Sequence, residues 1–242
     1  MKKLRSIRLI LPTSVTSLVF LLLVVSCKTP QYDAAGPYAP ATALATLVAG
    51  NRRFVQGKSK HPHQSHRRIV ETENGQHPFA VVITCSDSRV SPEIIFDGGL
   101  GDLFVVRTAG NLLSDLELGS IEYAVEHLGA ALVVVLGHTE CGAVKAFVEG
   151  GETSGHITDI VKALVDEQEE QLILRYEGKN LQACIEGNIL HGVVQIERDE
   201  PVLSEKIAHG KLAVVPMLYD IHTGLATVLQ EHELRKKHHA EK

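Results

Sequence analysis

Residues 79–89 read Phe-Ala-Val-Val-Ile-Thr-Cys-Ser-Asp-Ser-Arg, and this stretch decides the fold of the chain. Its first five residues are all apolar, without the alternation of polar and apolar residues that a half-exposed strand shows. Such a run is typical of a strand that is buried on both faces of a parallel sheet. The polar residues that follow, from Cys85 to Arg89, are therefore expected at the C-terminal end of a buried strand.

Four further strands are predicted downstream of this one. Residues 103–106 and 131–136 are apolar runs of the same buried kind, and the second leads directly toward His138. Residues 212–215 and 226–229 are separated by a turn sequence that contains Gly and Thr, which predicts a hairpin at the edge of the sheet.

Helical periodicity lies before and between these strands. Ser114 and Glu117 match a capping box, which predicts that a helix begins there and continues to His127. The other predicted helices cover residues 43–55, 156–176 and 180–199, and one begins at Gly142. Strands that alternate with helices predict an α/β fold, with a parallel-sheet core covered by helices on both faces and a C-terminal edge hairpin.

Three side chains have the chemistry of zinc ligands. His138 and Cys141 lie three residues apart, and Cys85 follows a different predicted strand. Because ligands bind at the carboxyl ends of the strands in open α/β sheets, all three are expected to meet there. Zn²⁺ prefers thiolates and imidazoles, and three protein ligands leave one coordination position open, as in catalytic zinc sites. A structural zinc would fill all four positions with protein ligands.

Asp87 and Arg89 lie beside the first of these ligands. In isolation, such a pair would be a loop cap and a surface charge. Next to a metal-binding cysteine, a carboxylate can orient a water on the metal, and an arginine can hold that carboxylate in a bidentate ion pair. We therefore expect Arg89 to keep Asp87 ionised and away from the metal.

Several segments together resemble the β-class carbonic anhydrases, over roughly residues 42–230. The segments that carry the resemblance are CSDSR at 85–89, HTECG at 138–142, GNRRF at 50–54, residues 101–111 and the pair Tyr219-Asp220. The resemblance implies one Zn²⁺ per chain, held by Cys85, His138 and Cys141. It also implies a lyase activity, the reversible hydration of CO₂ to bicarbonate and a proton by zinc-bound hydroxide.

The same resemblance implies roles for further residues and for assembly. Asp87 and Arg89 match the catalytic dyad of the family, and in some members the aspartate becomes a fourth zinc ligand that closes the site. The family's smallest unit is a homodimer with its active site near the interface, and dimers of dimers are common. One departure is Gly98, where many bacterial relatives carry a glutamine. The chain also lacks the tryptophan that bicarbonate-inhibited members use.

Two alternative functions remain open from the sequence. Some proteins on the same scaffold hydrolyse CS₂ or COS, so another small linear substrate is the first alternative. The second is a non-catalytic zinc protein whose metal only joins two loops. Asp87 and Arg89 argue against the second alternative, because a structural zinc has no use for the pair.

The N-terminal segment is predicted to be a lipoprotein signal peptide over residues 1–26. Four basic residues precede an apolar stretch that ends in Val24-Val25-Ser26-Cys27, which resembles a bacterial lipobox. A membrane-spanning helix is the alternative interpretation of this stretch. Lipidation at Cys27, followed by a flexible tether over residues 27–41, would give an exported lipoprotein in the periplasm or on the cell surface. Only its lipid anchor would contact the membrane.

Charge and cysteine content limit the remaining possibilities. The chain has 24 Lys and Arg against 29 Asp and Glu, and removal of residues 1–26 would take away four positive charges and leave a net charge of −9. An acidic domain without basic clusters is not expected to bind nucleic acid.

Cys184 falls in an apolar helical pattern, which predicts a buried and inert thiol. The domain is expected over residues 42–230, followed by a polar tail over 231–242.

Overall fold

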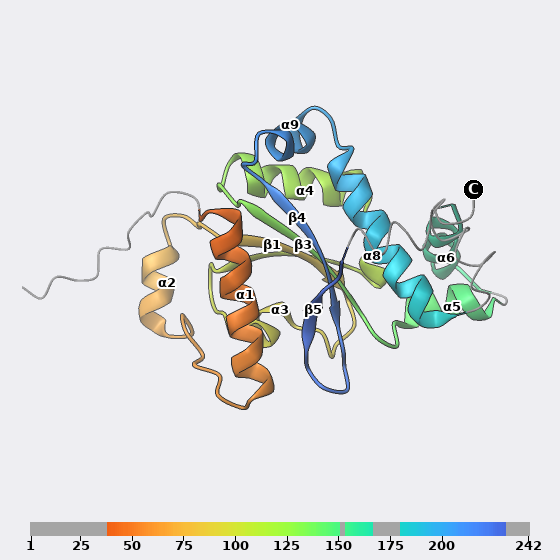
Figure 1. The fold of residues 1–242 in the computed structure, drawn as a ribbon, viewed down its shortest axis with the longest axis horizontal. Helices are drawn as coiled ribbons and strands as arrows, with labels where there is room; N and C mark the ends of the chain where they lie inside the picture. Colours follow the sequence, from red (N-terminus) through yellow and green to blue (C-terminus); the bar gives the residue numbers. More distant parts are fainter. Residues whose placement is uncertain (1–37, 151–152, 167–179, 231–242) are drawn as a thin grey trace, which may run out of the picture. The chain divides into compact units, whose positions relative to one another are not determined.

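Parallel strands form most of the central sheet of this computed structural model, which describes residues 38–150, 153–166 and 180–230. Within these residues the sheet has five strands in the order β2-β1-β3-β4-β5 (Figure 1). The strands are β1 (Ala80–Cys85), β2 (Leu103–Thr108), β3 (Leu132–His138), β4 (Ala213–Tyr219) and β5 (Ala226–Val228).

The register of the strands brings their C-terminal ends to one edge of the sheet. β1 pairs in parallel with β2, where Cys85 lies opposite Thr108, and with β3, where Thr84 lies opposite Leu136. β4 runs parallel to β3, and β5 returns antiparallel to β4. The predicted parallel core and the predicted edge hairpin are therefore both confirmed.

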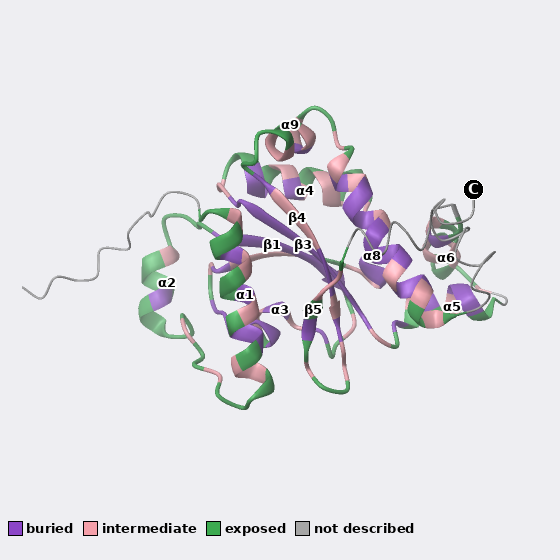
Figure 2. Cartoon of the chain, in the orientation of Figure 1, coloured by how far each residue is buried: buried purple, intermediate pink, exposed green. Residues whose placement is uncertain are grey.

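Helices cover both faces of the sheet. Their bounds are α1 (Pro40–Val55), α2 (His66–Thr72), α3 (Pro92–Ile95), the 3₁₀ turn η1 (Ala109–Asn111), α4 (Asp115–Glu126), α5 (Gly142–Glu149), α6 (Ile157–Asp166), α8 (Leu181–Glu197) and α9 (Val202–Ala208). Alternate residues of β1 point to opposite faces: Val82 packs with α1 and α3, whereas Ile83 packs with α4, α5 and α8. Every residue of β1 and β3 is buried (Figure 2), as the unbroken apolar runs predict.

Element boundaries differ from the expected ones in a few places. α1 begins at Pro40, two residues before the expected domain boundary at 42, because proline is favourable in the first turn of a helix. The capping box at Ser114 is present, since its backbone N–H donates to Glu117 Oε2 at 2.9 Å. The helix expected over 156–176 is described only as far as Asp166.

Other predictions concern the ends of the chain and one cysteine. The signal peptide, Cys27 and the polar tail over 231–242 lie outside the described residues. Cys184 is fully buried in α8, as expected. Over the parts of the chain that the structure describes, no helix is both long enough and apolar enough to cross a membrane.

The buried amide of Asn51 connects α1 to the C-terminal hairpin. Its Nδ2 donates to the carbonyl oxygens of Ile95 and Gly224, at 3.2 and 2.9 Å. Its Oδ1 accepts from the N–H of Ala226 at 2.9 Å. One side chain therefore satisfies three main-chain groups from segments that are distant in the sequence.

We expect the substitution Asn51→Leu to lower the free energy of unfolding by about 3 kcal/mol or more. Leucine preserves the approximate volume but leaves three main-chain polar groups without their partner, and each such group costs about 1–3 kcal/mol when buried. Urea unfolding followed by circular dichroism measures the effect. Asn74→Leu, at an exposed asparagine, is the control and should change stability by no more than about 0.5 kcal/mol. Equal stability of the two variants would contradict the assigned role of Asn51.

Candidate active site and metal centre

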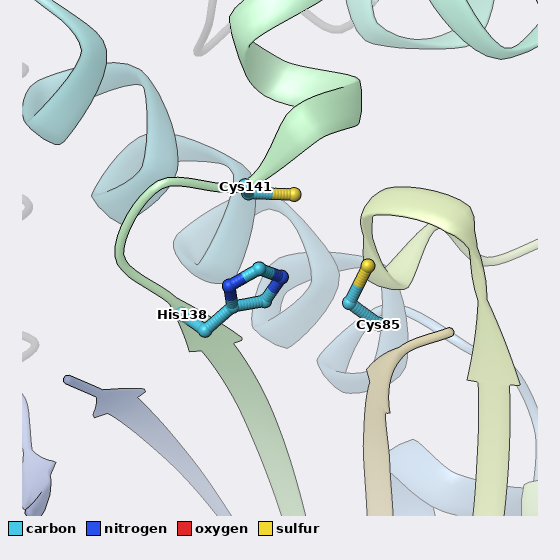
Figure 3. Close-up of side chains that lie close together, drawn as sticks. All are labelled: Cys85, His138 and Cys141. Atoms are coloured by element: carbon cyan, nitrogen blue, oxygen red, sulfur yellow. The ribbon is translucent and has the colours of Figure 1, made fainter. Parts of the chain in front are cut away.

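The three predicted metal ligands converge at the C-terminal edge of the sheet. Cys85 is the last residue of β1, His138 is the last residue of β3, and Cys141 caps the N-terminus of α5. Their side chains point toward one another (Figure 3), and one ligand atom from each lies within 4.8 Å of the other two. All three residues are buried. The structure thus brings together residues that lie 53 positions apart in the sequence.

The imidazole of His138 is oriented for a metal. Its Nδ1 lies 2.8 Å from the carbonyl oxygen of Thr139, a bond in which Nδ1–H is the donor. This leaves the lone pair on Nε2, which is buried and has no hydrogen-bond partner among the residues that the structure describes. A buried polar atom without a partner is costly, and coordination to a metal would satisfy it. The two sulfur atoms and this nitrogen form a donor set that fits Zn²⁺.

The surroundings of the two sulfur atoms favour negative charge on the pair. The Cys141 thiol, which hydrogen-bonds to Cys85, is the main cause that lowers the pKa of Cys85. The N–H of Gly110 also donates to Cys85 Sγ, at 3.3 Å. Cys141 stands at the N-terminus of α5, where the helix dipole favours a thiolate. The same contact with Cys85, together with burial, raises the pKa of Cys141, so without a metal one negative charge is held on Cys85. A bound cation would favour the loss of the second proton from Cys141.

Asp87 and Arg89 form the bidentate ion pair that the sequence predicts. Arg89 Nε donates to Asp87 Oδ1 at 2.9 Å, and Arg89 Nη2 donates to Oδ2 at 2.7 Å. The Arg89 guanidinium is the main cause that holds the pKa of Asp87 well below its usual range. Asp87 Oδ2 also lies 4.0 Å from His138 Nε2, so the carboxylate stands at the rim of the metal centre. The side chain of Asp87 is only 17% exposed, whereas that of Arg89 is 53% exposed.

Two further groups at the site had not been predicted as functional. Arg107, in β2, donates from Nε to the carbonyl oxygen of Cys85 at 3.2 Å and from Nη2 to that of Asp87 at 2.8 Å. It thereby fixes the loop that carries both a metal ligand and the dyad carboxylate. Gly110 supplies the N–H that contacts Cys85 Sγ. Its sequence signals were its position just after a predicted strand that ends at the same edge and its place within residues 101–111, which carry part of the family resemblance.

We expect one Zn²⁺ per chain in the wild type and a large loss of zinc in the variant Cys141→Ser. Serine keeps the approximate size of the side chain, but its hydroxyl is a much poorer zinc ligand than a thiolate. Metal analysis of purified, dialysed protein measures the content. Cys184→Ser is the matched control, because it alters a buried cysteine of α8 outside the ligand cluster and should retain zinc. Wild-type zinc content in Cys141→Ser would refute the ligand assignment.

Comparison with known proteins agrees with this geometry. The family model described as carbonic anhydrase matches residues 80–226. The chain is 42% identical over 198 residues to carbonic anhydrase 2 of Mycobacterium tuberculosis, which covers 80% of this chain and 94% of that protein.

Solved structures of β-carbonic anhydrases have the same fold. The β-carbonic anhydrase CcaA aligns with a TM-score of 0.64 at 27% identity, over 78% of this chain and 96% of that chain. A β-carbonic anhydrase of the ascomycete Sordaria macrospora, one of two described as tetrameric, aligns with a TM-score of 0.60 at 26% identity, over 77% and 96% of the two chains. The chain therefore belongs to the carbonic anhydrase family, in its β class.

Proposed function

We propose that this protein is a carbonic anhydrase, a zinc lyase that interconverts CO₂ and bicarbonate with one Zn²⁺ per chain. The observation that carries this proposal is the buried cluster of Cys85, His138 and Cys141 beside the ion pair of Asp87 and Arg89. Three protein ligands leave a coordination position for water, as a hydrolytic or hydrating zinc enzyme requires. The ion pair lies at the rim of that cluster, where a purely structural zinc would need no charged partner.

The protein's own groups provide the ligands and their orientation. Bound Zn²⁺ would supply a Lewis acid that lowers the pKa of a coordinated water toward neutrality. Cys85 and Cys141 would hold the metal as thiolates, and His138 would present Nε2 to it because the carbonyl oxygen of Thr139 accepts from its other ring nitrogen. The rigid ends of β1 and β3 carry two of the three ligands, so their geometry is set before any metal binds.

The ion pair of Asp87 and Arg89 has two tasks in this proposal. Asp87 Oδ2 lies 4.0 Å from His138 Nε2, where it would accept a hydrogen bond from a water held beside the three ligands. Arg89 occupies both carboxylate oxygens of Asp87 and so prevents the carboxylate from becoming a fourth ligand. Arg107 holds the backbone of the same loop by donating to the carbonyl oxygen of Asp87.

A CO₂ hydration assay of the zinc-loaded protein by stopped flow tests this function. We expect rapid hydration that is lost when a chelator removes the metal and restored by added Zn²⁺. Hydrolysis of CS₂ or COS without CO₂ hydration would replace the proposal by the first alternative. Bound zinc without activity on any of these substrates would indicate a structural metal.

The ion pair separates catalysis from mere metal binding. We expect Arg89→Ala to give a folded protein with full zinc content. Its CO₂ hydration rate should fall by about 10- to 100-fold, because the released carboxylate of Asp87 can occupy the open coordination position. Asp87→Asn should also lose activity, since an amide is a weaker acceptor than a carboxylate. The measurements are zinc content, circular dichroism and hydration rate on the same preparations.

Arg67→Ala is the matched control for the loss of an arginine. Arg67 is exposed and forms an ion pair with Glu71 on α2, so this variant removes the same charge outside the ligand cluster. It should keep wild-type turnover. If Arg89→Ala and Asp87→Asn both keep wild-type turnover as well, the proposed roles of the pair are wrong even where zinc is still bound.

We also propose that the protein forms a homodimer or a dimer of dimers. The tetrameric state of the Sordaria macrospora enzymes supports this assembly. Large apolar side chains on α2, α3 and the following loop are about half exposed, at 54% for Ile69, 58% for Ile94 and 49% for Leu100. Arg68 joins α2 to this loop by donating to the carbonyl oxygen of Leu100 at 2.8 Å. Exposed apolar side chains of this kind mark protein interfaces.

Export and lipidation at Cys27 are a separate proposal that rests on the sequence. A basic start, an apolar stretch and the Ser26-Cys27 pair are the features of a lipoprotein signal. The protein would then act in the periplasm or at the cell surface, with its lipid as the only contact with the membrane.

Labelling of cells with a radioactive fatty acid tests this proposal. We expect the wild type to incorporate the label and Cys27→Ala to incorporate none, because the thiol is the acceptor of the lipid. Cys184→Ala serves as the control and should be labelled like the wild type. Label in Cys27→Ala equal to that of the wild type, or a wholly cytoplasmic wild type, would contradict the proposal.

A further inference from the structure

The amide of Asn188 is buried within the otherwise mainly apolar helix α8. It is only 3% exposed, and its neighbours in the chain include the buried residues Ile185 and Ile189. Its Nδ2 donates to the carbonyl oxygen of Gly110 at 2.7 Å, across 78 residues of sequence. A buried amide is costly unless it is hydrogen-bonded, so this short bond fixes the position of Gly110 relative to α8.

Gly110 is the residue whose N–H donates to Cys85 Sγ. Its backbone is in the left-handed region, with φ 73° and ψ 19°, which favours glycine. A Cβ at this position would lie only 3.0 Å from the Cβ of Ala143, in the first turn of α5. Gly110 is therefore held between Cys85 on one side, α5 on another and Asn188 on a third.

Helix α8 is seated directly against the strand that carries another metal ligand. A Cβ at Gly137 would lie 2.5 Å from side-chain atoms of Ile189, so the helix approaches β3 at the residue that precedes His138. Asn188 and Ile189 are adjacent in the chain. Asn188 contacts Gly110, which donates to Cys85, and Ile189 lies against Gly137, which precedes His138. The helix thus sets the position of the Cys85 hydrogen-bond donor relative to the strand of His138.

We propose that Asn188 is a positioning residue of the metal centre, which holds Gly110 so that its N–H donates to the sulfur of the zinc ligand Cys85. The bond to Asn188 and the bond to Cys85 involve the two peptide units on either side of the Gly110 Cα. Asn188 therefore acts by fixing the backbone of Gly110, and not by polarising the N–H that contacts the sulfur. This role rests on the assignment of Cys85 as a zinc ligand and is independent of the substrate.

The hydrogen bond that Asn188 maintains has a chemical consequence at the sulfur. An N–H donor withdraws charge from a thiolate and so moderates how strongly it donates to a metal, which is a general means of tuning thiolate metal sites. Loss of Asn188 would leave the carbonyl of Gly110 without its partner and free the turn to move. The Cys85 sulfur would then lose its donor while the three ligands themselves remained in the chain.

Asn188→Leu tests this role in the Co²⁺-substituted protein. We expect Co²⁺ and Zn²⁺ affinity, measured by competition with a chelator, to fall by about 10- to 100-fold, as for other groups that orient metal ligands. The thiolate-to-cobalt charge-transfer band in the near ultraviolet should move to lower energy, because a sulfur without its donor is easier to oxidise. If Asn188→Leu does not fold, the same measurements are made on Asn188→Ser, whose side chain is too short to reach Gly110.

Asn51→Leu is the matched control, since it also removes a buried asparagine with long-range hydrogen bonds, but on the face of the sheet that α1 covers, opposite to α8 and the two cysteine ligands. It should leave metal affinity and the cobalt band unchanged despite its lower stability. An unshifted band and wild-type affinity in the Asn188 variant would overturn the proposal, as would equal shifts in both variants.

An NMR measurement on the wild type loaded with an NMR-active cadmium isotope tests the hydrogen bond itself. We expect a correlation between cadmium and the Gly110 amide proton, transmitted through the Cys85 sulfur, and its loss in the Asn188 variant. Correlations to the Cys85 β-protons without one to Gly110 would overturn the role of Asn188 alone. No correlation to Cys85 at all would overturn the ligand assignment on which the role rests.

Discussion

The parallel pairing of β1 with β3 is the constraint on which the rest of the site depends. Cys85 and His138 are distant in the sequence, and no local turn could bring them together. Because the two strands are direct neighbours and run in the same direction, their last residues reach the same edge of the sheet. Cys141 then needs only the short loop after β3 to join them. The metal centre is therefore a consequence of strand order.

Around this centre, hydrogen bonds from arginine side chains and from one main-chain N–H hold the ligands and the dyad carboxylate in place. Arg107 holds the carbonyl oxygens of the loop after β1, and Gly110 directs its N–H to a sulfur. Arg89 engages both oxygens of Asp87. Two thiolates bring more negative charge to a metal than imidazoles would, and the hydrogen bond from Gly110 and the helix dipole at Cys141 act against that excess. The site therefore combines two strongly electron-donating thiolate ligands with hydrogen-bond and dipole partners that reduce how much charge they donate.

The sequence predicted those parts whose signals are local. The unbroken apolar runs of β1 and β3 indicated burial on both faces, Ser114 and Glu117 indicated the start of α4, and the ligand types indicated zinc. Asn188 and Arg107 were not predicted as functional, for a physical reason. Their partners are main-chain atoms of distant segments, and a main-chain carbonyl carries no residue-specific signal. The position of such contacts follows from how α8 and β2 pack, which periodicity alone does not specify.

X-ray absorption spectroscopy of the zinc-loaded wild type tests the central claim most directly, because it counts the atoms around the metal. A site of Cys85, His138 and Cys141 should give two sulfur atoms at about 2.3 Å and one imidazole nitrogen at about 2.0–2.1 Å, with one further light atom to complete a tetrahedron. A shell with three or four sulfur atoms, or with none, would contradict the account of how this fold holds its metal.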